Sequence, residues 1–477
     1  MCGVIGIHGS PESAQEAYQG LLLMQHRGQD AAGILTQTNN QINLHKDVGL
    51  VDKVFSRDNL IALKGETSIG HTRYSTIGKI EAKDCLPFFS NYPFGISLAH
   101  NGNLKNIDEL KLKLHKKYQR FTYSNNDAEV MLNIISHYLS QKEHFNFELL
   151  SGAISELMEM CDGAYAVVGG ILSHGLFAFR DPHGIRPLVY GKKFNGTNWV
   201  YAFASESNTL EYLDYQYIKD VRPGELIYID NQMNFYSKNI QEKQLKTCMF
   251  EWIYFANPES VIDKKMVYQN RIHLGDYLAK KIKDLIDLDE VDVVVPVPET
   301  SRISAIRLSE LIQKPYRELL IKNRYIQRSF ILNDQKSREN AVRLKLSPVK
   351  KEIEGKNIIL VDDSIVRGTT SKNIIKLMRN AGAKKIIFAS TCPPILFPCH
   401  YGIDFPTTKE LVAHGKNYQE IKDALGADEV IYLNIPMLID ALETENICKK
   451  CLDGKEEIEF NTSNLINKQD PKNEINL

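Results

Sequence analysis

A cysteine stands at the second position of the chain, directly after the initiator Met. Removal of Met1 would leave Cys2 with both a thiol and a free α-amine. A free thiol, with a pKa of about 8.5, needs a base to act at neutral pH, and an α-amine with a pKa of about 8 can be that base. Cys2 therefore predicts a nucleophile, with the plain start of a first strand as the alternative.

Three further segments carry polar groups that suit the capture of an amide substrate. Arg73 offers a planar guanidinium that can pair with a carboxylate. Asn101 and Gly102 follow an apolar strand and predict a turn, where a side-chain amide and a backbone N–H can stabilise an oxyanion. Asp127 opens a predicted helix and can bind an ammonium group. Each segment also has an ordinary explanation: a turn for Asn101 and Gly102, a helix cap for Asp127, and a surface ion pair for Arg73. The combination with Cys2 favours catalysis.

The segments MCGVIGIHG, QHRGQDAAGI, GHTRYST and HNGNL resemble the signature blocks of class II glutamine amidotransferase domains. The resemblance implies an N-terminal nucleophile (Ntn) α-β-β-α sandwich in which Cys2 attacks the side-chain amide of glutamine. It also implies that Asn101 and Gly102 hold the oxyanion, and that Arg73 and Asp127 bind the carboxylate and the amine of glutamine. Several families share this half, so it indicates the nitrogen donor and leaves the acceptor open.

A second group of polar residues follows a short apolar run at 356–361. Asp362 and Asp363 come first, then a loop containing Gly368, and then a predicted helix that Gly382 ends. A second apolar run at 385–389 completes a predicted βαβ unit. Glycine and hydroxyl residues at a helix N-terminus suit a phosphate, and paired carboxylates suit ribose hydroxyls and a hard divalent cation. An acidic turn that caps a helix is the alternative.

The segment VDDSIVRGTT resembles the phosphoribosyl pyrophosphate (PRPP) motif of type I phosphoribosyltransferases, in a form close to that of the amidophosphoribosyltransferases. The implied PRPP-binding residues are Asp362, Asp363, Ser364, Val366, Arg367, Gly368, Thr369 and Thr370. Thr300, which follows a predicted strand at 293–297, is implied to join Asp362 and Asp363 around Mg²⁺. The basic and aromatic segment with Arg324 and Tyr325 would suit nucleic acid, but it resembles the family's mobile loop that closes over PRPP.

The chain has eight cysteines, and Cys448 and Cys451 form a CxxC pair. Alone, this pair is compatible with half of a zinc site, with a redox dithiol, or with a chance occurrence of two cysteines. Together with Cys248 and Cys399, it matches the ligands of the amidophosphoribosyltransferase subgroup that carries a [4Fe-4S] cluster. Zinc in the same cage is the alternative. Apart from Cys2, the remaining three cysteines are expected to be small buried residues: Cys85, Cys161 and Cys392.

The composition is that of an ordinary globular protein, with 477 residues, 43% of them hydrophobic and 25% charged. A formal net charge of −1 gives no general attraction to nucleic acid or to a membrane. The chain has no apolar run of the roughly 18 residues that cross a bilayer, and its start has no signal-peptide pattern. We therefore expect a cytoplasmic protein with no nucleic-acid or membrane partner, where reducing conditions favour metal binding over disulfides.

The motifs divide the chain into two halves and a tail, with the boundary in a polar segment. We predict a class II glutamine amidotransferase domain at 1–235 with the Ntn sandwich fold. A type I phosphoribosyltransferase α/β domain, with the cluster-binding segment, is expected at 236–454. A polar tail is expected at 455–477.

Together, the resemblances imply an enzyme that transfers the amide nitrogen of glutamine to PRPP. The products are 5-phosphoribosylamine, glutamate and pyrophosphate, in the first committed step of purine biosynthesis. Ammonia must pass between the two sites, so a closed passage is expected. The resemblance also implies a homotetramer and feedback inhibition by purine nucleotides. The alternatives are another class II amidotransferase, such as a sugar-phosphate aminating enzyme, or a non-catalytic PRPP-sensing regulator.

Overall fold

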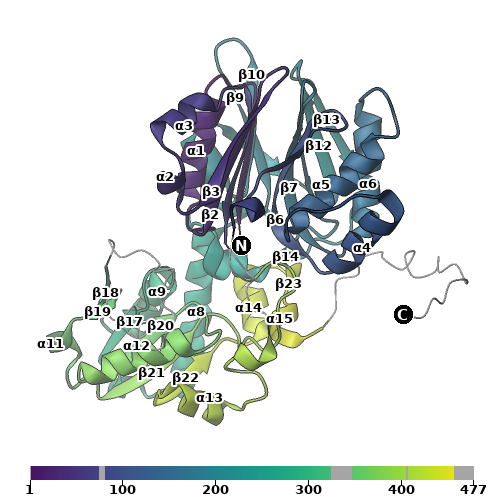
Figure 1. Cartoon of the computed structure of the whole chain (residues 1–477). Helices are drawn as coiled ribbons and strands as arrows, with labels where there is room; N and C mark the ends of the chain where they lie inside the picture. Colours follow the sequence, from purple (N-terminus) through teal and green to yellow (C-terminus); the bar gives the residue numbers. More distant parts are fainter. Residues whose placement is uncertain (1, 75–80, 324–345, 404–406, 456–477) are drawn as a thin grey trace, which may run out of the picture.

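The computed structural model describes residues 2–74, 81–323, 346–403 and 407–455. They form two bodies (Figure 1): an N-terminal body built on two stacked sheets, and a C-terminal body built on a four-stranded sheet with helices around it. Arg324 and Tyr325, which were predicted to belong to a closing loop, lie outside the described residues.

The N-terminal body contains two antiparallel sheets. The seven-stranded sheet has the order β11 (Gln216–Asp220), β9 (Val189–Phe194), β10 (Trp199–Ala204), β1 (Gly3–His8), β4 (Thr67–Arg73), β2 (Ala31–Gln37) and β3 (Ile42–Val48). The six-stranded sheet has the order β13 (Phe235–Asn239), β12 (Glu225–Asp230), β8 (Gly175–Arg180), β7 (Gly163–Ile171), β6 (Ile96–Leu104) and β5 (Phe88–Ser90).

The two sheets pack face to face, and helices cover their outer faces (Figure 1). At Gly6 in β1, an added Cβ would lie only 2.2 Å from Cγ1 of Val168 in β7. The helices against the first sheet are α1 (Ser13–Leu23), α2 (Val51–Val54), α3 (Arg57–Ala62) and α7 (Ser207–Tyr212). Those beside the second are α4 (Ile107–Tyr118), α5 (Asp127–Leu139) and α6 (Phe147–Met160). This layering confirms the predicted α-β-β-α sandwich.

The sheet of the N-terminal body continues slightly past the predicted boundary between residues 235 and 236. β13 starts at Phe235 and pairs with β12 as far as Asn239 opposite Glu225. Its side chains are exposed, so the strand has the polar sequence of a linker although its backbone belongs to the sheet. The chain enters the second body at β14 (Thr247–Cys248), which pairs in parallel with β23 (Ile447–Cys448).

The C-terminal body is organised by a parallel sheet with the order β17 (Val293–Pro296), β20 (Asn357–Asp362), β21 (Lys385–Ser390) and β22 (Glu429–Tyr432). These strands confirm the predicted apolar runs, which are buried because both faces of such a sheet are covered. The longer helices are α8 (Val267–Leu285), α9 (Arg302–Ile312), α12 (Thr369–Asn380), α13 (Tyr418–Leu425) and α14 (Ile435–Leu442).

Shorter elements complete the C-terminal body. The π-helical segment η2 (Glu251–Phe255) leads into it from β14. The others are β15 (Val261–Ile262), β16 (Lys265–Met266), β18 (Leu320–Lys322), β19 (Leu346–Pro348), α11 (Lys350–Ile353) and α15 (Lys450–Asp453). The predicted βαβ unit is β20, α12 and β21, and Gly382, with φ of +95°, follows the end of α12 as expected.

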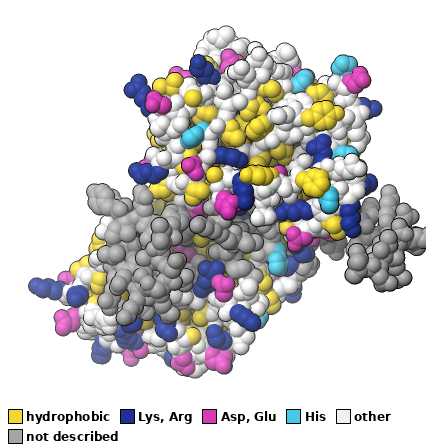
Figure 2. Space-filling model, in the orientation of Figure 1, with side chains coloured by type: hydrophobic (Ala, Val, Ile, Leu, Met, Phe, Trp, Pro, Cys, Tyr) yellow, Lys and Arg dark blue, Asp and Glu magenta, His cyan; other side chains and the backbone are white. Residues whose placement is uncertain are grey.

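On the face shown in Figure 2, basic and acidic side chains are interspersed over the described residues of both bodies. This mixture agrees with the formal net charge of −1. Within the described residues, no helix is both long and apolar enough to span a membrane.

Candidate active sites

The first site lies where Cys2, just before β1, meets Asn101 in β6 of the other sheet. The backbone nitrogen of Cys2 donates a hydrogen bond to Oδ1 of Asn101 at 3.0 Å. Nδ2 of Asn101 is buried and has no hydrogen-bond partner among the described residues. A buried amide donor without a partner costs free energy, so a ligand with an oxygen acceptor would complement this site.

Gly102 follows Asn101 in the same strand, and the predicted Asn-Gly turn is wrong. β6 continues to Leu104 because β7 pairs with it throughout, with Gly102 opposite Tyr165. Gly102 has a φ of +157°, and a Cβ there would lie 1.9 Å from the carbonyl oxygen of Ala164. Only glycine fits this close approach of two backbones.

The backbone N–H of Gly102 points away from β7. The carbonyl oxygen of His100 lies 3.1 Å from Nε2 of His71, and the N–H of Leu104 donates to Asp127 at 2.9 Å. Both contacts are made at the edge of β6 that faces away from β7. Alternate residues of a strand point their backbone groups to the same edge, so the N–H of Gly102 lies on this edge as well.

Arg73 ends β4 and Asp127 begins α5, and the structure brings both to this site. Nη1 of Arg73 donates to the carbonyl oxygen of Asp84 at 2.6 Å. Oδ1 of Asp127 lies 2.9 Å from Nε2 of His100, to which sequence reasoning gave no role. Burial raises the pKa of Asp127, but His100, the N–H of Leu104 and Arg73 together lower it more, and the net pKa is below its usual value. Asp127 therefore remains a carboxylate at neutral pH.

The second site is the loop between β20 and α12. Asp362 ends the strand, and its Oδ1 accepts a hydrogen bond from the N–H of Asp363 at 2.9 Å. Oγ of Ser364 donates to Oδ1 of Asp363 at 2.6 Å. Gly368, with φ of +73°, turns the chain into α12, whose first residues are Thr369 and Thr370. The loop thus joins two carboxylates to a helix N-terminus, the arrangement that attracts a phosphate with its cation.

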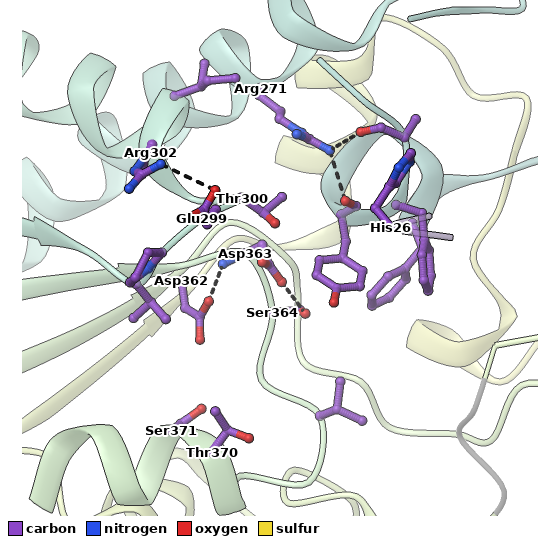
Figure 3. A pocket seen from close by; sticks show the side chains of 18 of the residues that line it. His26, Arg271, Glu299, Thr300, Arg302, Asp362, Asp363, Ser364, Thr370 and Ser371 are labelled. Carbon is purple, nitrogen blue, oxygen red and sulfur yellow. Dashed lines mark hydrogen bonds and ion pairs between the residues drawn. The ribbon is translucent and has the colours of Figure 1, made fainter. Parts of the chain in front are cut away.

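A cavity of about 880 Å³ opens at this loop (Figure 3). It is lined by all the residues predicted to bind PRPP, and by Thr300 from the loop after β17: Asp362, Asp363, Ser364, Val366, Arg367, Gly368, Thr369, Thr370 and Thr300. Nε of Arg367 lies 2.7 Å from a carboxylate oxygen of Glu410, at the rim of the loop. The strand order explains the position of Thr300, because β17 and β20 are neighbours and end at the same edge.

The paired carboxyl groups of the loop are buried, and this sets their charge. Burial raises the pKa of Asp363 to about 6. It also raises the pKa of Asp362 well above its usual value, and the neighbouring Asp363 raises it further. The pair therefore holds a proton readily when nothing compensates its charge, and a divalent cation would displace that proton.

The cavity is shared by the two bodies of the molecule. His26, Gln29 and Tyr74 of the N-terminal body line it together with the PRPP-motif residues of the C-terminal body. The segment from Phe250 to Pro258, which contains η2, also lines it. Residues of both bodies therefore meet at this one cavity.

A family model described as a glutamine amidotransferase domain matches residues 71–212, and one described as a phosphoribosyl transferase domain matches 264–398. The amidophosphoribosyltransferase of Escherichia coli K12 is 45% identical over 452 residues, which cover 94% of this chain and 89% of that protein. That of Methanothermobacter thermautotrophicus is 39% identical, covering 95% and 94%. This chain belongs to the amidophosphoribosyltransferase family.

Solved structures agree with this membership. The allosteric regulatory enzyme of purine biosynthesis aligns with a TM-score of 0.86 at 36% identity, covering 96% of this chain and 97% of that one. The glutamine PRPP amidotransferase from B. subtilis, complexed with ADP and GMP, aligns with a TM-score of 0.84 at 35% identity, covering 97% and 100%. The predicted fold class and the predicted enzyme, a glutamine-dependent amidophosphoribosyltransferase of purine biosynthesis, are confirmed.

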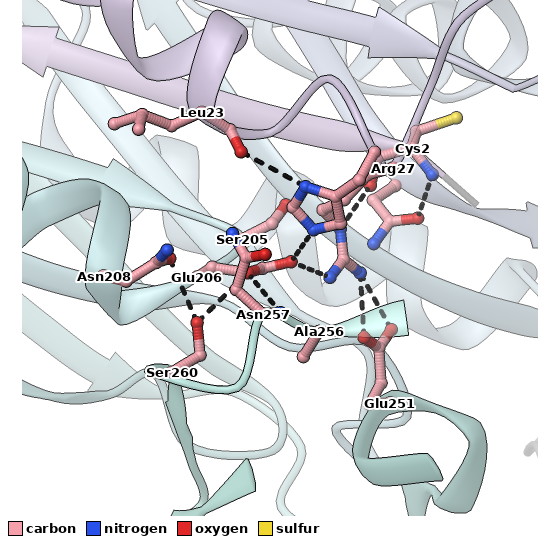
Figure 4. A network of polar contacts seen from close by, with 12 residues as sticks. Cys2, Leu23, Arg27, Ser205, Glu206, Asn208, Glu251, Ala256, Asn257 and Ser260 are labelled. Atoms are coloured by element: carbon pink, nitrogen blue, oxygen red, sulfur yellow. Dashed lines mark hydrogen bonds and ion pairs between the residues drawn. The ribbon is translucent and has the colours of Figure 1, made fainter. Parts of the chain in front are cut away.

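A buried polar network, absent from the sequence-based prediction, joins the two bodies near Cys2 (Figure 4). Nε of Arg27 donates to the carbonyl oxygen of Cys2 at 3.1 Å, and its Nη1 and Nη2 bind Glu206 and Glu251. The other oxygen of Glu206 accepts from the N–H of Asn257 at 2.9 Å, on the wall of the shared cavity. The QHRGQDAAGI block was the sequence signal that contained Arg27.

Arg271 is a second buried cation that the sequence did not single out. Its Nε and Nη2 donate to the carbonyl oxygens of Trp252, Tyr254 and Ala256, between 2.8 and 3.1 Å, and thereby hold the end of η2. Burial lowers the pKa of Arg271 to about 10, while the nearby Asp363 raises it. Arg271 lines the cavity with a full positive charge at neutral pH (Figure 3).

The predicted cluster ligands also gather in one place. Cys248 and Cys448 are direct partners in the β14–β23 pair. Cys451 follows one turn later, and its carbonyl oxygen accepts from the N–H groups of Leu396 and Phe397, shortly before Cys399. Burial raises the pKa of Cys248 to about 11, and the buried guanidinium of Arg186 opposes this shift. Among the described residues, no three Cys, His, Asp or Glu side chains are close enough to hold a metal ion.

Proposed function

We propose that Cys2, Asn101, Gly102, Arg73 and Asp127 form the glutaminase site of this enzyme, and that the β20–α12 loop binds PRPP. The cavity shared by the two bodies carries this proposal, because it brings the PRPP-motif loop against residues that neighbour Cys2 in the N-terminal body. The negative charge of Asp127 suits the ammonium group of glutamine, and the guanidinium of Arg73 suits its carboxylate.

Glutamine hydrolysis follows from these positions. After removal of Met1, the Cys2 nitrogen is an amine that takes the thiol proton while Sγ bonds to the amide carbon of glutamine. Oδ1 of Asn101 holds this nitrogen, and Nδ2 and the N–H of Gly102 are available to the oxyanion. The amine returns the proton to the leaving nitrogen, and ammonia departs. Water then hydrolyses the thioester to glutamate.

Ammonia formed at Cys2 reaches the second site through the shared cavity. There its lone pair bonds to C1 of PRPP while the bond from C1 to pyrophosphate breaks, and a proton is lost from the nitrogen. The N-terminus of α12 and the hydroxyl groups of Thr369 and Thr370 suit the 5-phosphate. Aromatic residues on the cavity wall, including Phe250 and Tyr254, exclude water that would protonate ammonia.

Mg²⁺ is the second element of the proposal, with Thr300, Asp362 and Asp363 around it. Carboxylate and hydroxyl oxygens are the hard donors that Mg²⁺ prefers, and these three residues line the same cavity. When bound, the cation neutralises the charge that develops on pyrophosphate.

A [4Fe-4S] cluster held by Cys248, Cys399, Cys448 and Cys451 is the third element. The four thiols lie in one apolar region, and Arg186, which is fully buried, acts electrostatically on three of them. Four thiolates are what such a cluster requires, and zinc in the same cage is the alternative.

Cellular context completes the proposal. The described cysteines, all eight of the chain, form no disulfide, which supports a reducing, cytoplasmic location. Feedback inhibition by purine nucleotides is supported by the related B. subtilis enzyme, whose structure is of a complex with ADP and GMP. A homotetramer is proposed from the family resemblance.

The test is the release of glutamate and pyrophosphate by anaerobically purified protein, given glutamine with or without PRPP and Mg²⁺. We expect coupled release from the wild type. Cys2→Ala should use ammonia in place of glutamine, and Lys238→Met, which changes an exposed side chain paired with Glu148, should keep both activities. Glutamate release that is indifferent to PRPP would contradict the proposed coupling.

A further inference from the structure

A loop of the C-terminal body lies directly against the strand that carries Asn101 and Gly102. Nδ2 of Asn103 donates to the carbonyl oxygen of His400 at 3.0 Å. Two residues later, Gly402 has a φ of +100°, and a Cβ built on it would lie 3.2 Å from the carbonyl carbon of Gly102 and 3.3 Å from its oxygen. The two contacts fall on consecutive residues of β6 and span almost 300 residues of sequence.

This loop covers the open edge of β6. On one edge, β7 pairs with β6 from Ile96 to Leu104. On the other edge, β5 pairs only from Ile96 to Leu98, so no named strand continues beside Gly102 among the described residues. The N–H and carbonyl of Gly102 point to this edge, and Gly402 packs against that carbonyl. The C-terminal body therefore supports the strand at the position where a strand neighbour is missing.

The loop is itself held on its other side. Arg186, on the connection between β8 and β9, is fully buried and donates through Nε to the carbonyl oxygen of Tyr401 at 2.8 Å. The N–H of Tyr401 donates to Sγ of Cys399 at 3.3 Å. His400, Tyr401 and Gly402 are thus fixed between the cysteine grouping and β6, and a shift of this loop would be transmitted to Gly102.

We propose that Asn103 and Gly402 are positioning residues of the glutaminase site, which hold the N–H of Gly102 where the oxyanion forms. This inference rests on the proposed function, in which Asn101 and Gly102 stabilise that oxyanion. Donors in such a site act because they are fixed before the reaction, and removing one typically lowers kcat about 10²- to 10³-fold. Displacement of a donor that is still present costs less, so the effect expected here is about 10-fold.

Position 402 accepts little other than glycine at this contact. A side chain there is strained by the positive φ, and its Cβ would press on Gly102 across the interface. Gly102 has no room to withdraw toward β7, because its own approach to Ala164 is already as close as glycine allows. Gly402→Ala should therefore move the carbonyl of Gly102, or separate the loop from β6, and either change alters the oxyanion site.

The experiment compares wild type, Asn103→Leu and Gly402→Ala with Gln244→Ala as the control. Gln244 donates to Asn446 at 2.9 Å, another side-chain contact between the bodies, away from β6. Each protein is assayed for kcat and KM of glutamine hydrolysis, for ammonia-dependent synthesis, for iron content, and for its affinities for glutamate γ-semialdehyde and for glutamate. The aldehyde adds to the Cys2 thiol and gives a tetrahedral oxyanion, whereas the product glutamate gives none.

Asn103→Leu and Gly402→Ala are expected to lower kcat and the semialdehyde affinity by the same factor of about 10, with little change in KM, in glutamate affinity or in iron content. Ammonia-dependent synthesis should remain, and the control should match the wild type. Unchanged semialdehyde affinity in Asn103→Leu would overturn this inference and leave the proposed function standing. So would a loss of ammonia-dependent activity as large as the loss of glutamine hydrolysis. Failure of the wild type to hydrolyse glutamine would overturn the proposed function and the inference with it.

Discussion

Nη2 of Arg27 donates to both carboxylate oxygens of Glu251, at 2.9 and 3.0 Å, and neither side chain is exposed to solvent. The same guanidinium binds Glu206 and the carbonyl oxygen of Cys2. Because Glu251 begins η2, which lines the shared cavity, one buried cation connects the backbone of Cys2 to the wall of that cavity.

Arg27→Met should destabilise the protein strongly, because Glu206 and Glu251 would lose a buried counter-charge. The expected decrease in the free energy of unfolding is about 3–5 kcal/mol, measured by urea denaturation. Lys238→Met is the control, since Lys238 pairs with Glu148 at the surface and such a pair contributes about 0–1 kcal/mol. Equal effects of the two substitutions would show that the buried network contributes no more than a surface pair.

The stability that Glu206 contributes should depend on pH. Burial raises its pKa, but His26 and Arg27 lower it more, and the net pKa lies far below the usual value. A carboxyl group with a depressed folded pKa stabilises the protein above its unfolded pKa of about 4.3, and loses this contribution as the pH falls further.

The difference in unfolding free energy between wild type and Glu206→Gln should therefore shrink as the pH falls below about 4.5. Urea denaturation at pH 7, 5.5, 4.5 and 4 measures it. Glu148→Gln, at an exposed carboxylate, is the control and should differ little from the wild type at each pH. A difference that does not change with pH would contradict the depressed pKa.

Asp363→Asn should impair the use of PRPP while glutamine hydrolysis without PRPP is preserved. The substitution removes a charge from the loop that lines the cavity, and a hydrogen bond to a charged group is worth about 1.5–3 kcal/mol. We expect kcat/KM for PRPP to fall about 10- to 150-fold, in steady-state assays with ammonia as the nitrogen source. Asp423→Asn, on the surface of α13, should have no effect.

Cys451→Ser should remove iron and lower stability together if the cysteines hold a structural cluster. Iron content and the midpoint of thermal unfolding are measured on anaerobically purified protein. Cys161→Ala changes a buried thiol in the other body and should retain all the iron. A Cys451→Ser protein of normal stability that has lost activity would indicate a catalytic cluster instead.

The sequence by itself determined what depends on neighbouring residues. The β20–α12–β21 unit could be predicted because two apolar runs, an amphipathic helix and a terminating glycine lie within about 30 residues, and local hydrogen bonds fix how they fold. The same unit carries Asp362, Asp363 and Gly368, so the composition of the PRPP loop followed with it. Residue chemistry indicated Cys2 and Asn101, whereas family resemblance named glutamine as their substrate and added Thr300.

Tertiary structure decided what depends on distant pairing. Asn101 and Gly102 have the sequence of a turn, but β7 pairs with both residues, in a close backbone approach that glycine allows, and the strand continues. Arg27 finds Glu206 and Glu251 179 and 224 residues away, and no periodicity marks such partners. Buried charges need partners of opposite charge, and the backbone groups of a strand need hydrogen-bond partners. Which residues supply them depends on how the whole chain folds.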